Sequence, residues 1–211
     1  MPIYRLDKFK NGSALAVWEI TETEEQLLQL CSVPNNELED LQYMSNPDRR
    51  RERLAVRVLL DQLLDEKAYV GYHENGRPYL QNDSADISIA HTKRFACIYY
   101  NPEVNVGVDI ECLSRNFSAV EKKALSEEES EYLSDTQRNI QLCIIWCAKE
   151  AIFKVMSSTG IDFVKQIMVE RFTPRKKGKL SATFTTSEGI VSELELSYRI
   201  LDDHALVWVG V

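Results

Sequence analysis

The chain has 211 residues, and its 25 Lys and Arg against 33 Asp and Glu give a net charge of −8. Apolar residues make up 44% and aromatic residues 9%, which is enough for a hydrophobic core and excludes global disorder. The acidic total argues against general nucleic-acid binding, whose affinity comes from neutralising phosphates. No run approaches the roughly 20 apolar residues of a membrane span, and the first residues lack the apolar block of a secretion signal.

Five cysteines are scattered along the chain, and their spacing matches none of the patterns typical of zinc sites. An odd, scattered set favours reduced thiols, so we expect a cytoplasmic protein. The positions are Cys31, Cys97, Cys112, Cys143 and Cys147.

Apolar residues recur at helical spacing between Asp48 and Leu64, which predicts a helix with Asp48 as its N-cap. A basic start to a helix is most often a solvated face. In an acidic protein it also fits an anion, held by arginine forks and unpaired backbone N–H groups. The basic cluster comprises Arg49, Arg50, Arg51, Arg53 and Arg57.

The rest of the chain alternates between short strand patterns and helix patterns. In each half a helix is followed by antiparallel strands, which indicates an α+β protein of two similar lobes, each a small antiparallel sheet packed with helices. Strands are predicted over 86–90, 95–100, 104–111, 180–186, 191–200 and 205–211, and helices over 118–124, 127–133 and 136–157.

Two carboxylates, Asp109 and Glu111, stand two residues apart in the strand predicted over 104–111, so both leave the same face. That spacing allows one small cation between them, and Gly107 on the same face leaves the space free. An ordinary strand with an exposed polar face has the same alternation.

A second group of polar residues occurs at i, i+4 and i+8 and so shares one helix face: Trp146, Glu150 and Lys154. An exposed Glu–Lys pair would have the same spacing. The helix is apolar on most sides, however, which is typical of a buried helix, and a buried charge needs a partner or a metal. Lys149 belongs to the same polar island. His91, outside this helix, is a lone histidine, and most lone histidines are structural.

Four stretches, taken in order, make the sequence resemble the 4′-phosphopantetheinyl transferase superfamily, in particular its longer type that activates peptide and polyketide synthases. The family pattern G-[VI]-D-[IV]-E is intact in the third, and W-x-x-K-E-[AS]-x-x-K in the fourth. The stretches are Asn75–Leu80, Ile87–Thr92, Val106–Glu111 and Trp146–Lys154.

The resemblance implies two similar α+β lobes related by a pseudo-twofold axis, with coenzyme A in the cleft between them. We expect residues 1–102 to form the nucleotide-side lobe and residues 103–211 to form the lobe with the metal acids. The implied reaction transfers phosphopantetheine from coenzyme A to a serine of an apo acyl or peptidyl carrier protein and releases adenosine 3′,5′-bisphosphate. We expect a monomer that binds neither nucleic acid nor membrane.

The resemblance also implies roles for individual residues. Asp109, Glu111 and Glu150 match the metal-binding acids, with Mg²⁺ or Mn²⁺ as the ion. Lys149 and Lys154 match lysines that bind the cofactor. Catalysis is assigned to Asp109, Lys154 and Glu150, the last as base toward the carrier serine, either directly or through a metal-bound water.

On the coenzyme A side, His91 matches a phosphate-binding histidine and Arg77 lies near the nucleotide. Arg53 is assigned to the 3′-phosphate, with Arg49 and Arg50 as further candidates. One departure stands out: the family usually has Ser before the histidine, where this chain has Ala90.

Two other functions stay open at this point. A non-catalytic module that holds coenzyme A or a carrier protein is one. A different Mg²⁺-dependent phosphotransferase or hydrolase is the other. The sequence does not name the carrier protein.

Overall fold

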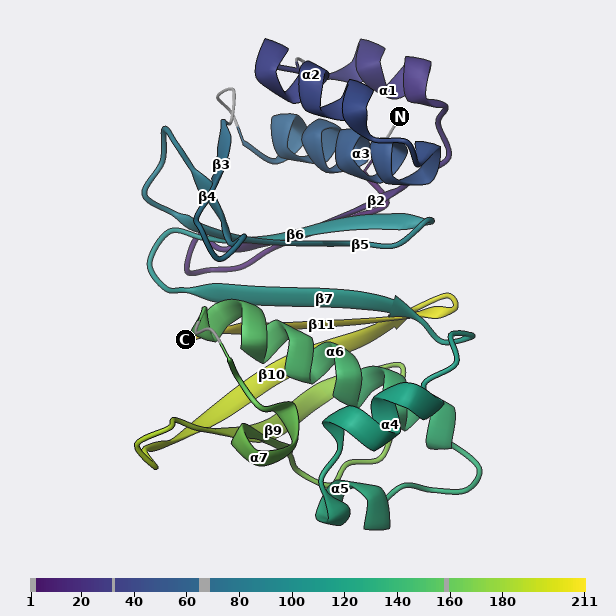
Figure 1. Cartoon of the computed structure of the whole chain (residues 1–211), viewed down its shortest axis with the longest axis vertical. Helices are drawn as coiled ribbons and strands as arrows, with labels where there is room; N and C mark the ends of the chain where they lie inside the picture. Colours follow the sequence, from purple (N-terminus) through teal and green to yellow (C-terminus); the bar gives the residue numbers. More distant parts are fainter. Residues whose placement is uncertain (1–2, 32, 65–68, 158–159) are drawn as a thin grey trace.

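The computed structural model describes residues 3–31, 33–64, 69–157 and 160–211, apart from the side chains of residues 35–37. The described elements lie in four layers: helices, an antiparallel sheet, a second antiparallel sheet and helices again (Figure 1). The predicted α+β class is therefore confirmed. None of the helices in the described ranges combines the length and apolar character needed to cross a bilayer.

The first half of the chain forms the upper two layers of Figure 1. Its four-stranded sheet has the order β1-β2-β6-β5, and β3 pairs with β4 in a separate hairpin. Helix α3 packs on the sheet through residues such as Leu54 and Leu59, around the buried Trp18. The elements are β1 (Arg5–Lys8), β2 (Ala14–Glu19), α1 (Glu24–Leu30), α2 (Asn35–Tyr43), α3 (Pro47–Leu63), β3 (Val70–Tyr72), β4 (Pro78–Leu80), β5 (Asp86–His91) and β6 (Phe95–Asn101).

The second half forms the lower two layers, with sheet order β7-β11-β10-β9-β8. The long helix α6 covers the face of this sheet that points away from the first half (Figure 1). The elements are β7 (Val106–Cys112), α4 (Ser118–Ala124), α5 (Glu127–Glu131), α6 (Arg138–Met156), α7 (Phe163–Gln166), β8 (Ile167–Val169), β9 (Lys177–Thr185), β10 (Val191–Leu201) and β11 (His204–Gly210).

The two halves follow the same path. In each, an early strand (β2 or β7) pairs antiparallel with the last strand (β6 or β11), which pairs with the strand before it (β5 or β10). One long helix, α3 or α6, packs on each sheet. The similarity of the halves is thus visible in the topology. The boundary expected at residue 102 falls in the connection between β6 and β7, and its status as a domain boundary stays a prediction.

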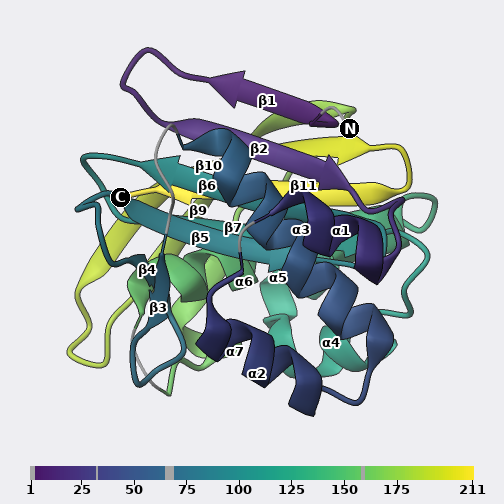
Figure 2. The same ribbon diagram turned by 90° about the horizontal axis from the view of Figure 1, so that it is seen from above.

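The two sheets face each other, and Figure 2 shows them overlapping when viewed from above. Apolar side chains from both fill the space between them, including Val17 from β2, Cys97 from β6 and Leu206 from β11. The strand β7 contributes Val106, Val108 and Ile110 to this core, so its opposite parity faces α6. The alternation predicted for this strand is confirmed.

Gly107 has a different reason from the one inferred from the sequence. A Cβ at this position would lie 1.9 Å from the backbone oxygen of Ala151, because α6 presses directly on β7 there. The absent side chain therefore admits the helix backbone and does not hold space for a cation. This close approach brings the polar face of α6 against Asp109 and Glu111.

Candidate active site

One cleft contains a residue from each of the four sequence stretches singled out above. Its volume is about 500 Å³, within the range of small-molecule sites. Arg77 comes from the β3–β4 hairpin, His91 from the end of β5, Asp109 from β7 and Lys154 from α6. Segments far apart in sequence and from both halves of the chain therefore converge on one site.

Lys154 is the central contact of this cleft. Its ammonium donates to Asp109 Oδ1 at 2.8 Å, to the carbonyl oxygen of Val108 at 2.8 Å and to that of Ile89 at 3.4 Å. Burial lowers the pKa of Lys154, but the charge and hydrogen bond of Asp109, together with the nearby Cys97 and Glu150, outweigh it, and the net pKa is raised. Lys154 is thus held as a cation between β5 and β7.

The other carboxylate oxygen, Asp109 Oδ2, is buried and has no hydrogen-bond partner. A buried carboxylate oxygen without a partner is unfavourable unless a cation or donor reaches it. This atom is the clearest sign in the site of an open position for a positive ligand.

Glu111 lies next to Asp109 on the same face of β7. Its Oε1 accepts a hydrogen bond from Trp146 Nε1 at 3.3 Å and forms an ion pair with Arg115. Burial and the charge of Asp109 raise the pKa of Glu111, whereas Arg115 opposes the shift. The predicted face of α6 is correct, since both Trp146 and Lys154 contact β7.

Glu150, one turn from each of those residues, is the most perturbed acid of the group. Burial raises the pKa of its carboxyl group to about 7, and the charges of Asp109 and Glu111 add to the effect. The three acids therefore share one electrostatic environment. The carboxylate oxygens of the three acids do not all lie within 4.8 Å of one another. Among the described residues, only Cys112, Asp203 and His204 form a group with that spacing.

The seam between β5 and β7 is held by side chains. Ser88 Oγ accepts the backbone N–H of Val108 at 3.0 Å, and Asp86 Oδ2 accepts that of Val106 at 2.7 Å. Val108, the residue that precedes Asp109, is thus bound at its N–H by Ser88 and at its carbonyl by Lys154. Two residues from opposite halves fix the backbone next to this acid.

Arg77 spans the two halves at the edge of the cleft. Its guanidinium pairs with Asp86 of β5 and donates to Ser157 Oγ and, at 3.3 Å, to the carbonyl of Val155 at the end of α6. Arg77 is therefore largely committed to protein contacts, although it lines the cleft.

His91 contacts the buried carboxylate of Glu52, with Nδ1 at 2.9 Å from Oε2. Arg49 binds the same oxygen at 3.1 Å. Burial lowers the pKa of His91, and the charges of Arg49 and Lys154 lower it further against the opposing effect of Glu52. Arg49 is thus the arginine that the structure places beside His91.

Part of the chain matches a known protein family. Residues 105–208 match the model of the 4′-phosphopantetheinyl transferase superfamily. The second half of the chain is therefore similar to this superfamily. The comparison with curated proteins finds no match.

Solved structures that match include the crystal structure of the holo-[acyl-carrier-protein] synthase of Thermotoga maritima. It is 22% identical, with a TM-score of 0.41, and the match covers 51% of this chain and 62% of that chain. This chain thus spans less than two thirds of that protein.

The superfamily match includes Asp109, Glu111, Glu150 and Lys154. It begins at residue 105, after Arg77 and His91. The structure brings the latter two to the same cleft. Arg53 does not line that cleft among the described residues, and its recorded partner is Asp40 of α2, at 3.4 Å.

The expectation that Lys149 binds the cofactor is wrong. Its side chain is 0% exposed, and its ammonium lies 2.7 Å from Glu129 Oε2, which is also fully buried. Three backbone carbonyls complete its contacts: those of Ala124, Phe163 and Ile167. Lys149 faces a different side of α6 from Glu150 because consecutive residues of a helix point about 100° apart.

Sequence reasoning missed Ser88, Glu52 and Glu129. Ser88 has a weak sequence signal, since it is a polar residue between two isoleucines. Glu52 and Glu129 have none, because both lie in charged runs that resemble solvated faces. Their burial comes from packing against distant elements.

Proposed function

We propose that this chain transfers the 4′-phosphopantetheine arm of coenzyme A to a serine hydroxyl of an apo carrier protein. The observation that carries the proposal is the convergence of Arg77, His91, Asp109 and Lys154 on one cleft. The match of residues 105–208 to the superfamily supports the same reaction class. The longer, two-lobed type is favoured because two similar halves in one chain supply both sides of the cleft.

The acids fit a hard divalent cation. Asp109 offers an unpartnered buried oxygen, and Glu111 and Glu150 both have raised pKa values, as expected of carboxylates short of positive charge. Asp109, Glu111 and Glu150 would hold Mg²⁺ or Mn²⁺. When bound, the ion would neutralise charge on the pyrophosphate of coenzyme A.

The chain's own residues account for the remaining chemistry. The serine oxygen attacks the phosphorus that carries the pantetheine arm, and the bond from that phosphorus to the bridging pyrophosphate oxygen breaks. Glu150, with a pKa near neutral, takes the serine proton directly or through one water. Lys154 stabilises negative charge on the departing phosphate. His91 would bind a phosphate from the first half, with Arg49 beside it on the shared carboxylate of Glu52.

The test is incubation with coenzyme A, Mg²⁺ and a panel of apo carrier proteins, read by intact mass. We expect a carrier mass gain of one phosphopantetheine and release of adenosine 3′,5′-bisphosphate. Asp109→Ala and Glu150→Ala should abolish transfer. Glu188→Ala, in the exposed β9–β10 turn, is the matched control and should transfer normally.

The alternatives give different results. Binding of coenzyme A without transfer to any carrier would favour a non-catalytic module. Turnover that ignores the 3′-phosphate, tested with dephospho-coenzyme A, would favour another phosphotransferase. Normal transfer by Asp109→Ala would overturn the site assignment.

A further inference from the structure

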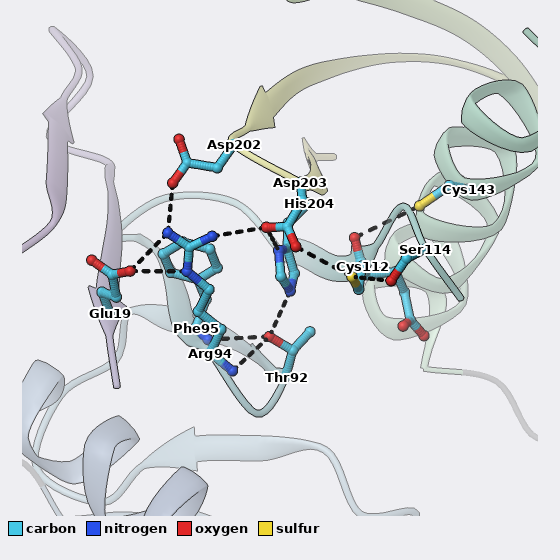
Figure 3. A network of polar contacts seen from close by, with 11 residues as sticks. Glu19, Thr92, Arg94, Phe95, Cys112, Ser114, Cys143, Asp202, Asp203 and His204 are labelled. Atoms are coloured by element: carbon cyan, nitrogen blue, oxygen red, sulfur yellow. Dashed lines mark hydrogen bonds and ion pairs between the residues drawn. The ribbon is translucent and has the colours of Figure 1, made fainter. Parts of the chain in front are cut away.

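A second cluster of ligand-type side chains lies at the far end of β7, beside the turn between β10 and β11 (Figure 3). Cys112 ends β7 and stands directly opposite His204 in the antiparallel register. Asp203 precedes His204, and its backbone carbonyl accepts the N–H of Leu113 at 2.7 Å. Sheet pairing therefore fixes the backbone positions of three side chains with different ligand chemistry.

The three side chains are spaced like the ligands of one ion. One ligand atom from each lies within 4.8 Å of the others. Asp203 Oδ2 lies 3.7 Å from Cys112 Sγ, and Asp203 Oδ1 lies 2.9 Å from His204 Nδ1. Ligand atoms of a tetrahedral zinc ion lie about 3.3 to 3.6 Å apart, given bonds of about 2.0 to 2.3 Å. Only small movements separate this arrangement from coordination.

The surrounding charge favours a cation despite the nearby Arg94. Its guanidinium contacts Asp203 Oδ1 at 2.8 Å, Asp202 at 2.7 Å and Glu19 at 2.8 Å. Three carboxylates thus surround one guanidinium, which leaves a local excess of two negative charges. Asp203 Oδ2 points toward Cys112 and away from Arg94 (Figure 3).

His204 is held in place for this role. It is 3% exposed, its Nε2 lies 3.2 Å from Thr92 Oγ1, and the ring packs edge-on against Phe95. A ligating histidine usually makes such a hydrogen bond through its other nitrogen, which fixes the ring orientation. Asp203 is exposed and Cys112 half-buried, so the cluster is open to solvent on one side.

We propose that Cys112, Asp203 and His204 bind one transition-metal ion of the Zn²⁺ class, separately from the acids of the cleft. Thiolate, imidazole and carboxylate are the ligands that this class selects, whereas Mg²⁺ requires oxygen ligands. The thiol of Cys112 releases its proton to solvent on binding. Ser114 Oγ, 3.1 Å from Cys112 Sγ, or a water takes the fourth position. The ion would strengthen the contact between the second half of the chain and the β5–β6 turn, which carries Thr92 and Arg94.

Cobalt(II) is the probe, because a thiolate ligand gives it a near-ultraviolet charge-transfer band that oxygen ligands do not. The full chain is reduced, saturated with Mg²⁺ and titrated with Co²⁺. We expect the band to saturate at one Co²⁺ per chain and to disappear when Zn²⁺ is added. Zn²⁺ should also raise the melting temperature of the wild-type chain.

Variants decide the assignment. Cys112→Ser should abolish the band, and so should Cys112→Ala, while Cys31→Ser, at another half-buried thiol, should retain it. Asp203→Asn should weaken Co²⁺ binding at least tenfold. Asp109→Ala should leave the band intact, which separates this site from the proposed transferase site. A wild-type chain that is folded but shows no band, or a band that persists in Cys112→Ser, would overturn the proposal.

Discussion

Lys154 of α6 and Asp109 of β7 form an ion pair of 2.8 Å that also reaches the carbonyl of Ile89 on β5. This lysine thus contacts both sheets at the cleft, while the second oxygen of Asp109 stays buried without a partner. Lys154 therefore serves both the fold and the proposed chemistry. It fixes the position of Asp109 through one carboxylate oxygen and leaves the other oxygen available to a cation.

Replacement of Lys154 by Met should destabilise the protein by about 2 to 3 kcal/mol, because the carboxylate of Asp109 is then left buried and uncompensated. The loss is smaller than for a fully buried pair because both side chains keep some exposure. Urea denaturation at pH 7.5 measures the effect. Lys154→Arg keeps the charge and should recover most of the loss, and equal stability of Lys154→Met and wild type would contradict the assignment.

Much of the second half could be predicted from the sequence. The helix expected over 136–157 is α6 (Arg138–Met156), and the strand expected over 104–111 is β7 (Val106–Cys112). These elements have strong periodicity because one face of each is buried. Asp48 is not the N-cap of α3; the side chain of Asn46 accepts the N–H groups of Asp48 and Arg49. Pro47 favours this, since proline suits the first helical position.

The first 44 residues and the exact roles of the charged residues could not be predicted. The strand β2 is buried on both faces, so it lacks the alternation that marks a half-buried strand. Lys149 and Lys154 belong to one motif, yet one is interior and the other reaches the cleft. Their separation depends on which side of α6 meets β7, and that is set by tertiary contacts such as the one at Gly107. The Cys112–Asp203–His204 cluster could not be predicted for the same reason, because strand pairing joins Cys112 and His204, which are 92 positions apart in the sequence.

Stability should depend on pH through Glu150. Its pKa is about 7 in the folded protein, against 4.5 for an ordinary glutamate, so the folded state holds the proton more tightly. The stabilising contribution of the protonated Glu150 to folding is complete below about pH 4.5. It is lost as the pH rises toward 7, because the carboxyl group of the unfolded chain ionises first. The metal-free Glu150→Gln variant should therefore be more stable than wild type at pH 8, by roughly 1 to 2 kcal/mol.

Thermal denaturation in EDTA at pH 5 and pH 8 measures this difference. The two proteins should converge at the lower pH, where the wild-type carboxyl is protonated. Glu188→Gln, at an exposed turn, controls for the general effect of removing a negative charge. A constant gap between Glu150→Gln and wild type at both pH values would contradict a raised pKa.

Lys149→Met should reduce stability without acting on the cleft. The change leaves the fully buried Glu129 without its counter-charge, and such a loss costs about 3 to 5 kcal/mol. Burial lowers the pKa of Lys149, and Glu129 opposes this shift. The pair therefore contributes most to the free energy of unfolding at pH values where both groups are ionised. Chemical denaturation gives the free energy, and isothermal titration with coenzyme A gives affinity of the folded protein.

The double variant Lys149→Met with Glu129→Leu separates the two roles. Removal of both charges should restore part of the stability, since no uncompensated charge remains. Coenzyme A affinity should stay within about twofold of wild type. A large loss of coenzyme A affinity in a folded Lys149→Met protein would show that Lys149 contributes to coenzyme A binding.

Ser88 should position Asp109 for the proposed transfer reaction. Ser88→Ala leaves the N–H of Val108 without its acceptor, which costs about 1 to 3 kcal/mol in a buried setting and loosens the peptide before Asp109. Small displacements of a catalytic group reduce rates steeply, so we expect kcat to fall roughly ten- to hundredfold. The KM for coenzyme A should change little, and the Mg²⁺ concentration for half-maximal rate should rise.

Ser88→Thr retains the hydroxyl and should restore kcat. A rise in the KM for coenzyme A at unchanged kcat would instead make Ser88 a ligand-contacting residue, since it also lines the cleft.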